Sequence, residues 1–484
     1  MTEKRPERKI PVRSFAISGK AEKFAPLLLL LICTLSAEPL LNRPLWFDEA
    51  LTVLNFALLE TPDKIYHSYI IPNNQIVHTI LLHWWIKLFS FDFLRLLPLL
   101  CGMSCLLFLW QLRRKSGNTA AFATLAILAS SFPFTLYATA LRGYMLSAAA
   151  VSGGAWMVVR YLESGRKGFL AGWFCFSLLG VGTMPGTIAG LAAAGLYAVG
   201  CCRREIFKKW RLYLAGVVPV AAFFLFYAPI WRDLRRCAGL GEGWHNGSSM
   251  LLALAMGTGF TFLPLMAAAF AGELRKHRRR LKMLHWLIWL LPVPAAYCFK
   301  VAPFPRVFFP MFPVFALLLA GGVKDFFALI RSRLGRKYVG NIAILLIAAG
   351  VCWGVVCRNE AVREKISALH PSPGGQEDFI DCHFVKSSFT PRETVTELKK
   401  RLPQGAEVYV SFGSDPWALI YAGMESGVNL NFRFDGPGGN FPGVPHYAVK
   451  HVDEDEKLPA NRFNCRFREL FSNENHTILV REYE

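Results

Sequence analysis

Long apolar runs separated by short basic loops fill the first three quarters of this chain. The runs are long enough to cross a lipid bilayer as helices. Lys and Arg collect in alternate loops, which places those loops in the cytoplasm and fixes the direction of each span. The pattern predicts an α-helical polytopic membrane protein of about eleven transmembrane helices within residues 24–357. The predicted helices cover approximately residues 24–42, 94–112, 119–138, 143–162, 168–183, 186–201, 211–231, 250–271, 283–299, 306–323 and 339–357.

A basic segment, residues 1–23, precedes the first apolar run and is expected to lie in the cytoplasm. It resembles the start of a signal peptide, but the run that follows is long enough to span and no small-residue cleavage site is evident. We therefore expect this first helix to be retained. Residues 43–93 then form the first external loop, and residues 76–89 within it are too short and too polar to span comfortably. Their Trp and Lys content favours a helix lying at the membrane interface.

Residues 358–484 have the pattern of a small soluble α/β domain outside the membrane. Proline stands near the start of its first predicted helix, where a missing N–H is harmless. The second helix is expected to open with Asp415 as its N-cap. The predicted elements are a helix at 391–402, a strand at 407–412, a helix after Asp415 and a Gly/Pro-rich loop at 435–445.

Composition agrees with a membrane protein: 53% of the 484 residues are hydrophobic, and the mean hydropathy is +0.32. The formal net charge is +20, but it is uneven. Residues 358–484 hold 15 Lys and Arg against 19 Asp and Glu, whereas the preceding residues carry a net charge of +24. The basic residues lie in loops between apolar runs, so they report orientation and exclude a nucleic-acid partner.

Two adjacent carboxylates, Asp48 and Glu49, follow the first predicted span. One interpretation is structural, with Asp48 as a helix N-cap and Glu49 in the first turn. The other is functional, because charged groups at a membrane face carry a desolvation cost unless they are solvated or paired. Cations are unfavourable on the external side and need a reason to be there. Those predicted on the same face are Lys87, Arg95, Arg142, Arg232, Arg235, Arg236, Lys300 and Arg306.

Arg142 stands at a tight turn between two apolar runs, next to Tyr144. A guanidinium at that position suits a bound phosphate, because its planar donors match phosphate oxygens. The alternative is a side chain that snorkels to the interface.

The order of these features resembles the GT-C superfamily of membrane glycosyltransferases that use polyprenyl-phosphate-linked sugars, which includes protein O-mannosyltransferases and lipid A aminoarabinose transferases. The sequence departs from the family at residues 77–79, Val-His-Thr where Pro or Tyr is common, and at Leu141, where a polar or acidic residue is common. The matching segments are residues 46–50, 73–78, 81–89, 93–98, 137–144, 305–310, 408–410 and 417–421.

The resemblance implies a GT-C-type fold and an inverting sugar transfer, with Asp48 as the base and Arg142 binding the donor phosphate. Glu49 would orient the acceptor, hold a cation or brace the loop. The residue types suit this reaction, because a phosphate leaves without a general acid and one carboxylate is enough to take the acceptor's proton. Lys87 and Arg306 are secondary phosphate-binding candidates, and the other candidate site residues are Asn74, His78, His83 and Tyr144.

No cofactor is expected. His78 and His83 are five residues apart, unlike the i, i+4 pair of a helical metal site, and no third ligand is evident, so a divalent cation is not indicated. Cys382 and Cys465 would form a disulfide in an oxidising compartment or remain two buried thiols.

The expected partners are a polyprenyl-phosphate-sugar donor, a protein, lipid or glycan acceptor, and the bilayer of the cytoplasmic membrane. The alternative function is a non-enzymatic flippase or transporter of lipid-linked glycans. Transporters place polar residues near the midplane, often in repeated halves, and neither feature is evident. A membrane-anchored interaction protein would leave Asp48 and the external cations unexplained.

Overall fold

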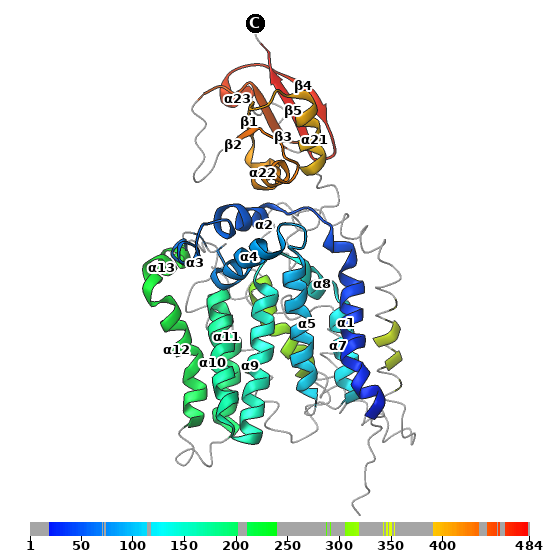
Figure 1. The fold of residues 1–484 in the computed structure, drawn as a ribbon, viewed down its shortest axis with the longest axis vertical. Coiled ribbons are helices and arrows are strands. Elements are labelled where there is room, and N and C mark those ends of the chain that lie inside the picture. Colours follow the sequence, from blue (N-terminus) through cyan, green and yellow to red (C-terminus); the bar gives the residue numbers. More distant parts are fainter. Residues whose placement is uncertain are drawn as a thin grey trace, which may run out of the picture.

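A computed structural model gives the fold of this chain, which is mostly helical with one small β-sheet (Figure 1). Isolated positions at residues 71 and 454 and between residues 287 and 353 are described as well as the continuous segments. The continuous segments that the structure describes are residues 19–69, 74–113, 118–201, 211–239, 305–318, 391–434, 443–452 and 460–482.

Within the described segments, seven long helices form a bundle, and they run side by side (Figure 1). Each is rich in apolar residues, and several present large apolar side chains on the surface, as lipid-facing helices do. Their bounds are α1 Gly19–Leu41, α5 Leu96–Gln111, α7 Asn118–Ser130, α9 Tyr144–Ser164, α10 Lys167–Thr183, α11 Ile188–Cys201 and α12 Arg211–Tyr227.

Among the described residues, three helical stretches are long and apolar enough to cross a membrane: Glu22–Leu41, Tyr144–Ser164 and Gly216–Cys237. The predicted number of eleven spans stays a prediction. The predicted helices at 250–271 and 283–299 lie almost wholly outside the described residues, and most of 339–357 does too.

The expectation of one continuous helix over residues 119–138 is wrong. The segment breaks at Ser131, whose backbone is extended (ψ 140°), into α7 and a short helix α8, Phe132–Thr139. Pro133 lies in the first turn of α8, where its missing N–H is tolerated, whereas in the middle of a longer helix it would break a hydrogen bond.

The centre of the bundle is α9, which is buried over most of its length. Its packing against α10 depends on small residues: a Cβ added at Gly153 would lie 2.5 Å from the Phe176 ring, and one at Gly154 would lie 2.5 Å from Trp173. Close helix approach of this kind is how membrane helices associate without a hydrophobic driving force.

A crossing layer, residues 47–89, lies over one end of the bundle (Figure 1). The helix at 76–89 forms where the sequence predicts it, as α4; its position at a membrane interface stays a prediction. The elements of this layer are α2 Phe47–Thr52, a π-helical turn η1 Val53–Ala57, α3 Pro62–His67 and α4 Ile76–Phe89.

Shorter elements accompany the described helices of the bundle. The short 3₁₀ helix η2, Pro185–Thr187, joins α10 to α11, and η4, Ala228–Ile230, leads from α12 into α13, Trp231–Gly239. A further 3₁₀ segment, η6 Pro305–Met311, packs against α9.

The C-terminal part is an α/β domain beyond the crossing layer (Figure 1). Its sheet has the order β2-β1-β3-β5-β4, in which β1 is parallel to β2 and β3, whereas β5 is antiparallel to β3 and β4. The elements are α21 Pro391–Arg401, β1 Glu407–Val410, η8 Phe412–Ser414, α22 Pro416–Glu425, β2 Asn431–Phe434, β3 Tyr447–His451, α23 Ala460–Phe463, β4 Phe467–Ser472 and β5 His476–Arg481.

The helix, strand and helix predicted at the start of this domain are present as α21, β1 and α22. The capping prediction was only half right, since Asp415 occupies the N-cap in a left-handed conformation (φ 51°) and its side chain makes no capping hydrogen bond. Of the predicted loop at 435–445, residues 435–442 lie outside the described part.

Helix α22 connects the α/β domain to the crossing layer by direct packing. It packs against α2, and its Tyr421 is buried in an apolar cluster with Leu45 and Leu94. The Tyr421 ring also meets Phe91 edge-on at 6.3 Å between centroids.

Candidate active site

Glu49 is the centre of a buried polar network. Its side chain is completely buried in the first turn of α2. Oε1 accepts hydrogen bonds from the Leu141 N–H at 2.7 Å, from Arg95 at 2.9 Å and from Arg43 at 3.3 Å. Oε2 accepts from Arg95 at 2.9 Å and from the Trp46 N–H at 3.3 Å. Five donors therefore occupy this carboxylate.

The charge balance keeps Glu49 ionised. Burial by itself would raise the pKa of its carboxyl, but the charges of Arg95 and Arg43 and the hydrogen bonds from Arg95 and Leu141 outweigh it and hold the pKa below its usual value. Burial and the neighbouring Arg95 lower the pKa of Arg43 to about 9, which still leaves it protonated at neutral pH.

Arg95 extends this network into the backbone. Its guanidinium donates to the carbonyl oxygens of Arg43 at 3.1 Å, Pro44 at 2.9 Å and Thr139 at 2.6 Å. The loop before α2, the start of α5 and the end of α8 are thereby tied together. Sequence reasoning had noted Arg95 only as an external cation and had missed Arg43; the available signal was a cation six residues before Glu49, on the side where cations are disfavoured.

Asp48 and Arg142 come together, although 94 positions separate them in the chain. Asp48 Oδ2 lies 3.9 Å from Arg142 Nη2, and the two side chains are 21% and 4% exposed. Arg142 also donates to Thr52 Oγ1 at 3.3 Å, and its guanidinium carbon lies 5.8 Å from the centre of the buried Tyr144 ring. Asp48 is not the N-cap of α2, a position that Trp46 holds. The pair combines a partly open carboxylate with a buried cation.

The turn that carries Arg142 is held by Gln75, which lies in the matching segment 73–78 but was not among the predicted site residues. Gln75 is buried, and its Oε1 accepts a hydrogen bond from the Gly143 N–H. A Cβ at Gly143 would lie 2.4 Å from Thr183 Cγ2 and 2.9 Å from Gln75 Oε1. Only glycine fits there, which lets α4 and α10 close tightly around the turn.

His78 lies beside this turn, on the first turn of α4, and is 1% exposed. A Cβ at Gly143 would lie 3.1 Å from His78 Cβ. Within the described residues, neither ring nitrogen has a hydrogen-bond partner. Burial, together with the positive charge of Arg142, lowers the His78 pKa to about 3 despite the opposing effect of Glu49, so the imidazole is neutral.

Two other candidates have local partners. His83 is buried, and its Nδ1 lies 2.8 Å from the Ala57 carbonyl oxygen, to which it donates. Asn74 is buried and donates through Nδ2 to the carbonyl oxygens of Ile65 at 3.0 Å and Ser68 at 3.2 Å. Both side chains join parts of the crossing layer.

Lys87 and Arg306 are placed differently. Lys87 is exposed near the end of α4, with its Nζ 5.1 Å from the centre of the Trp84 ring. It is nine residues beyond His78, about 13 Å along the helix axis. The backbone of Arg306 belongs to η6, but its side chain lies outside the described part. The η6 residue Phe309 packs at 4.4 Å on Tyr137, which contacts Tyr144 at 5.1 Å between ring centroids.

No group of three or more His, Cys, Asp or Glu side chains that could hold a metal ion occurs within the described segments. Cys382 lies outside them, so its pairing with Cys465 stays a prediction.

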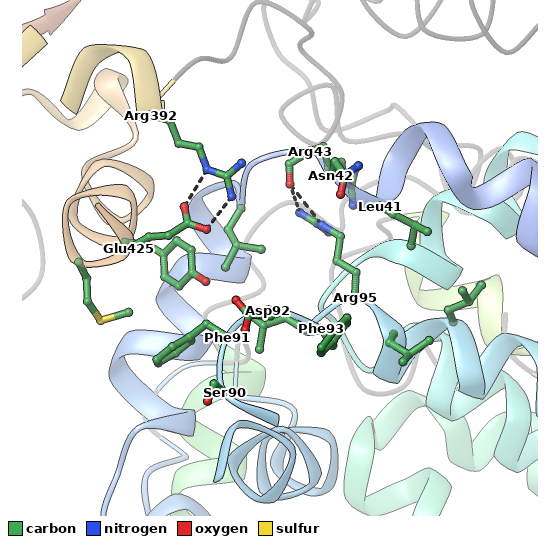
Figure 2. Close-up of a pocket in the computed structure, with 16 residues that line it drawn as sticks. Leu41, Asn42, Arg43, Ser90, Phe91, Asp92, Phe93, Arg95, Arg392 and Glu425 are labelled. Atoms are coloured by element: carbon green, nitrogen blue, oxygen red, sulfur yellow. Dashed lines mark hydrogen bonds and ion pairs between the residues drawn. The ribbon is translucent and has the colours of Figure 1, made fainter. Parts of the chain in front are cut away.

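A cavity of about 730 Å³ lies where the α/β domain meets the loop between α4 and α5 (Figure 2). Arg392 and Glu425 bridge its α/β side with two hydrogen bonds of 2.6 and 2.7 Å, and Arg43 and Arg95 lie on its other side. Neither Asp48 nor Arg142 lines it. Two of the arginines that bind Glu49 thus line this cavity, whereas the Asp48–Arg142 pair does not.

Two solved structures of ArnT from Cupriavidus metallidurans share this fold. The structure in the apo state has a TM-score of 0.58 and 12% sequence identity, over 95% of this chain and 98% of that chain. The structure bound to undecaprenyl phosphate has a TM-score of 0.54 and 13% identity, over 96% and 98% of the two chains. No protein-family model and no curated protein matches the sequence. The similarity shows that this chain shares the fold of ArnT.

Proposed function

We propose that this chain is an integral-membrane glycosyltransferase that transfers a sugar from a polyprenyl phosphate to an acceptor hydroxyl. The observation that carries the proposal is the Asp48–Arg142 pair, a partly open carboxylate 3.9 Å from a buried guanidinium. The fold shared with ArnT, which has been solved with bound undecaprenyl phosphate, supports a donor of this kind.

Asp48 is the general base in this proposal. It takes the proton of the acceptor hydroxyl as that oxygen bonds to the anomeric carbon. The bond from this carbon to the phosphate oxygen breaks, and the phosphate leaves with the electron pair. Attack from the face opposite the phosphate inverts the anomeric centre.

Arg142 binds the leaving phosphate. It is 4% exposed, and a fixed cation in a site with little water stabilises developing negative charge strongly. Its contact with Asp48, at 3.9 Å, is longer than a direct hydrogen bond, so a phosphate can compete for the guanidinium. Lys87 and Arg306 stay secondary candidates for binding the donor phosphate.

Glu49 braces the site. Its oxygens are occupied by five donors, which leaves little capacity to accept a proton from a substrate. Through the Leu141 N–H, Glu49 fixes the residue that precedes Arg142. Because Glu49 directly follows Asp48 on α2, its buried contacts also fix the backbone that carries Asp48.

We place the protein in the cytoplasmic membrane, with about eleven spans, a cytoplasmic N-terminus, and the site and the α/β domain on the extracytoplasmic side. The acceptor is a protein hydroxyl, lipid A or a surface glycan. The flippase alternative is not favoured, because Asp48, Glu49 and Arg142 gather at one end of the bundle.

The experiment measures release of undecaprenyl phosphate by purified wild type, Asp48→Asn and Arg142→Ala. The donors are undecaprenyl phosphates that carry mannose, glucose, galacturonic acid or aminoarabinose, each offered with candidate acceptors. Both variants should lose turnover by at least about a hundredfold, the range reported for a positioned base or a charge-stabilising donor. Asp63→Asn, on an exposed carboxylate of the same layer, and Arg160→Ala, near the far end of α9, are the matched controls. Normal turnover in folded Asp48→Asn and Arg142→Ala would refute the mechanism.

A further inference from the structure

His78 is a buried polar side chain that makes no hydrogen bond to any described residue. Buried polar atoms are almost always hydrogen-bonded, and an unpaired one costs the free energy of its lost hydration. Both imidazole nitrogens of His78 are buried, and no described residue bonds either of them. The other buried histidine of α4, His83, engages its Nδ1 with the Ala57 carbonyl oxygen.

The surroundings of His78 indicate what would bind it. His78 lies beside the turn that carries Arg142, since a Cβ added at Gly143 would lie 3.1 Å from His78 Cβ. The charges of Arg142 and Glu49 both act on its ring. Glu49 is already occupied by five donors, whereas Arg142 is the residue proposed to hold a phosphate. A neutral imidazole carries one N–H donor, and it can complement the guanidinium without adding a second buried positive charge.

We propose that His78 binds the donor lipid directly, by donating a ring N–H to a phosphate oxygen alongside Arg142. This inference rests on the proposed function, since it takes the Arg142 turn as the phosphate site. The phosphate needs several donors at once, and Arg142 supplies them from one residue only. His78 supplies another hydrogen-bond donor from α4, and the bound phosphate gives one of its ring nitrogens a hydrogen-bond partner.

The test measures binding of undecaprenyl phosphate, and separately of undecaprenol, to the purified full-length protein in nanodiscs. His78→Leu removes the polar atoms with little change in volume, and His78→Gln keeps an N–H donor. We expect His78→Leu to weaken binding of the phosphate about tenfold to a hundredfold, the range for a hydrogen bond to a charged group. Binding of undecaprenol should not change, and His78→Gln should recover part of the affinity.

Thermal stability separates this role from simple packing. Replacing an unpaired buried polar group by an apolar one of similar shape is neutral or stabilising. His78→Leu should therefore lose affinity without losing Tm. His67→Gln is the control: His67 is an exposed histidine of the crossing layer that bonds the Asp63 carbonyl oxygen, so its replacement should leave affinity for the phosphate unchanged.

The outcomes are distinct. Equal affinity of wild type and His78→Leu for undecaprenyl phosphate, with weaker binding by Arg142→Ala, would overturn the role of His78 and leave the proposed function standing. Absence of phosphate-dependent binding by wild type would overturn both. An equal loss of undecaprenol binding by His78→Leu would also overturn the role. Should His78→Leu not fold, His78→Met provides the same comparison.

Discussion

Substitution of Glu49 by Gln should open the loop that carries Asp48. The change removes the charge that compensates two buried arginines, Arg95 and Arg43, and turns an amide N–H₂ toward their donors. Breaking a buried ion pair by removing one partner costs about 3–5 kcal/mol. The Glu49 side chain is fully buried and Arg95 is 6% exposed, so solvent screens little of this loss.

The loss should appear as local opening. The Leu141 N–H donates to Glu49 at 2.7 Å, so the exchange rate of this amide reports the contact directly. If opening becomes easier by about 3–5 kcal/mol, exchange should accelerate by roughly two to three and a half orders of magnitude, up to the rate of a free amide. Hydrogen-exchange mass spectrometry on peptides covering residues 46–52 and 139–143 measures it.

Glu60→Gln is the control, since Glu60 is an exposed carboxylate of the same layer, paired with Lys64 at 2.5 Å. Exposed pairs contribute little, and exchange near Leu141 should not change. Turnover by Glu49→Gln should fall about a hundredfold, because a small displacement of Asp48 relative to Arg142 has that effect. Unchanged exchange at Leu141 in a folded Glu49→Gln protein would refute the assignment of Glu49 as the brace.

Two further predictions concern the Arg142 turn. Gly143→Ala should destabilise the protein by about 1–3 kcal/mol, because the new Cβ would lie 2.4 Å from Thr183 Cγ2. The double variant Gly143→Ala/Thr183→Ser removes that methyl group, so thermal unfolding should show that it recovers part of the lost stability. No recovery would mean that the clash lies elsewhere. His78 should make the free energy of unfolding depend on pH, because its pKa of about 3 in the folded state lies below the ordinary 6.5. As the pH falls, the unfolded chain takes up a proton on this residue before the folded chain does. The contribution of neutral His78 to stability is therefore full above pH 6.5 and is lost as the pH falls toward 3. At pH 5 the wild type should be about 2 kcal/mol less stable than at pH 7 through this residue, and an identical pH dependence in His78→Gln would contradict a buried, neutral imidazole.

The sequence predicted the main features of the fold because apolar periodicity and basic loops are local signals. It also selected Asp48 and Arg142, which the structure places 3.9 Å apart, since topology assigned both to the same end of the bundle. The break at Ser131 escaped notice because the apolar run continues through it, although Pro133 was a local sign.

The support of the site could not be predicted, because it depends on tertiary contacts without a sequence pattern. Nothing about a glutamine before a helix indicates that Gln75 will bind the backbone of Gly143. For Glu49 the sequence left three roles open, namely orienting the acceptor, holding a cation or bracing the loop, and its buried partners could not be foreseen. Glu49 differs from its neighbour Asp48 because α2 turns Glu49 toward Arg95 and Arg43 and leaves Asp48 partly open.

The partners of Glu49 emerge from the ribosome in a fixed order: Arg43 first, Arg95 about fifty residues later, and Leu141 last. When α1 has been inserted, the carboxylate has only Arg43 and the nearby Trp46 N–H, and it must remain hydrated until the hairpin of α8 and α9 is in place. The loop that carries Asp48 and Glu49 is therefore among the first segments translated, but its contacts cannot be completed until several later helices have been made. A chain stalled before Leu141 would leave Glu49 without that partner at the membrane surface, where proteases and chaperones that monitor unfinished membrane proteins could recognise the open loop.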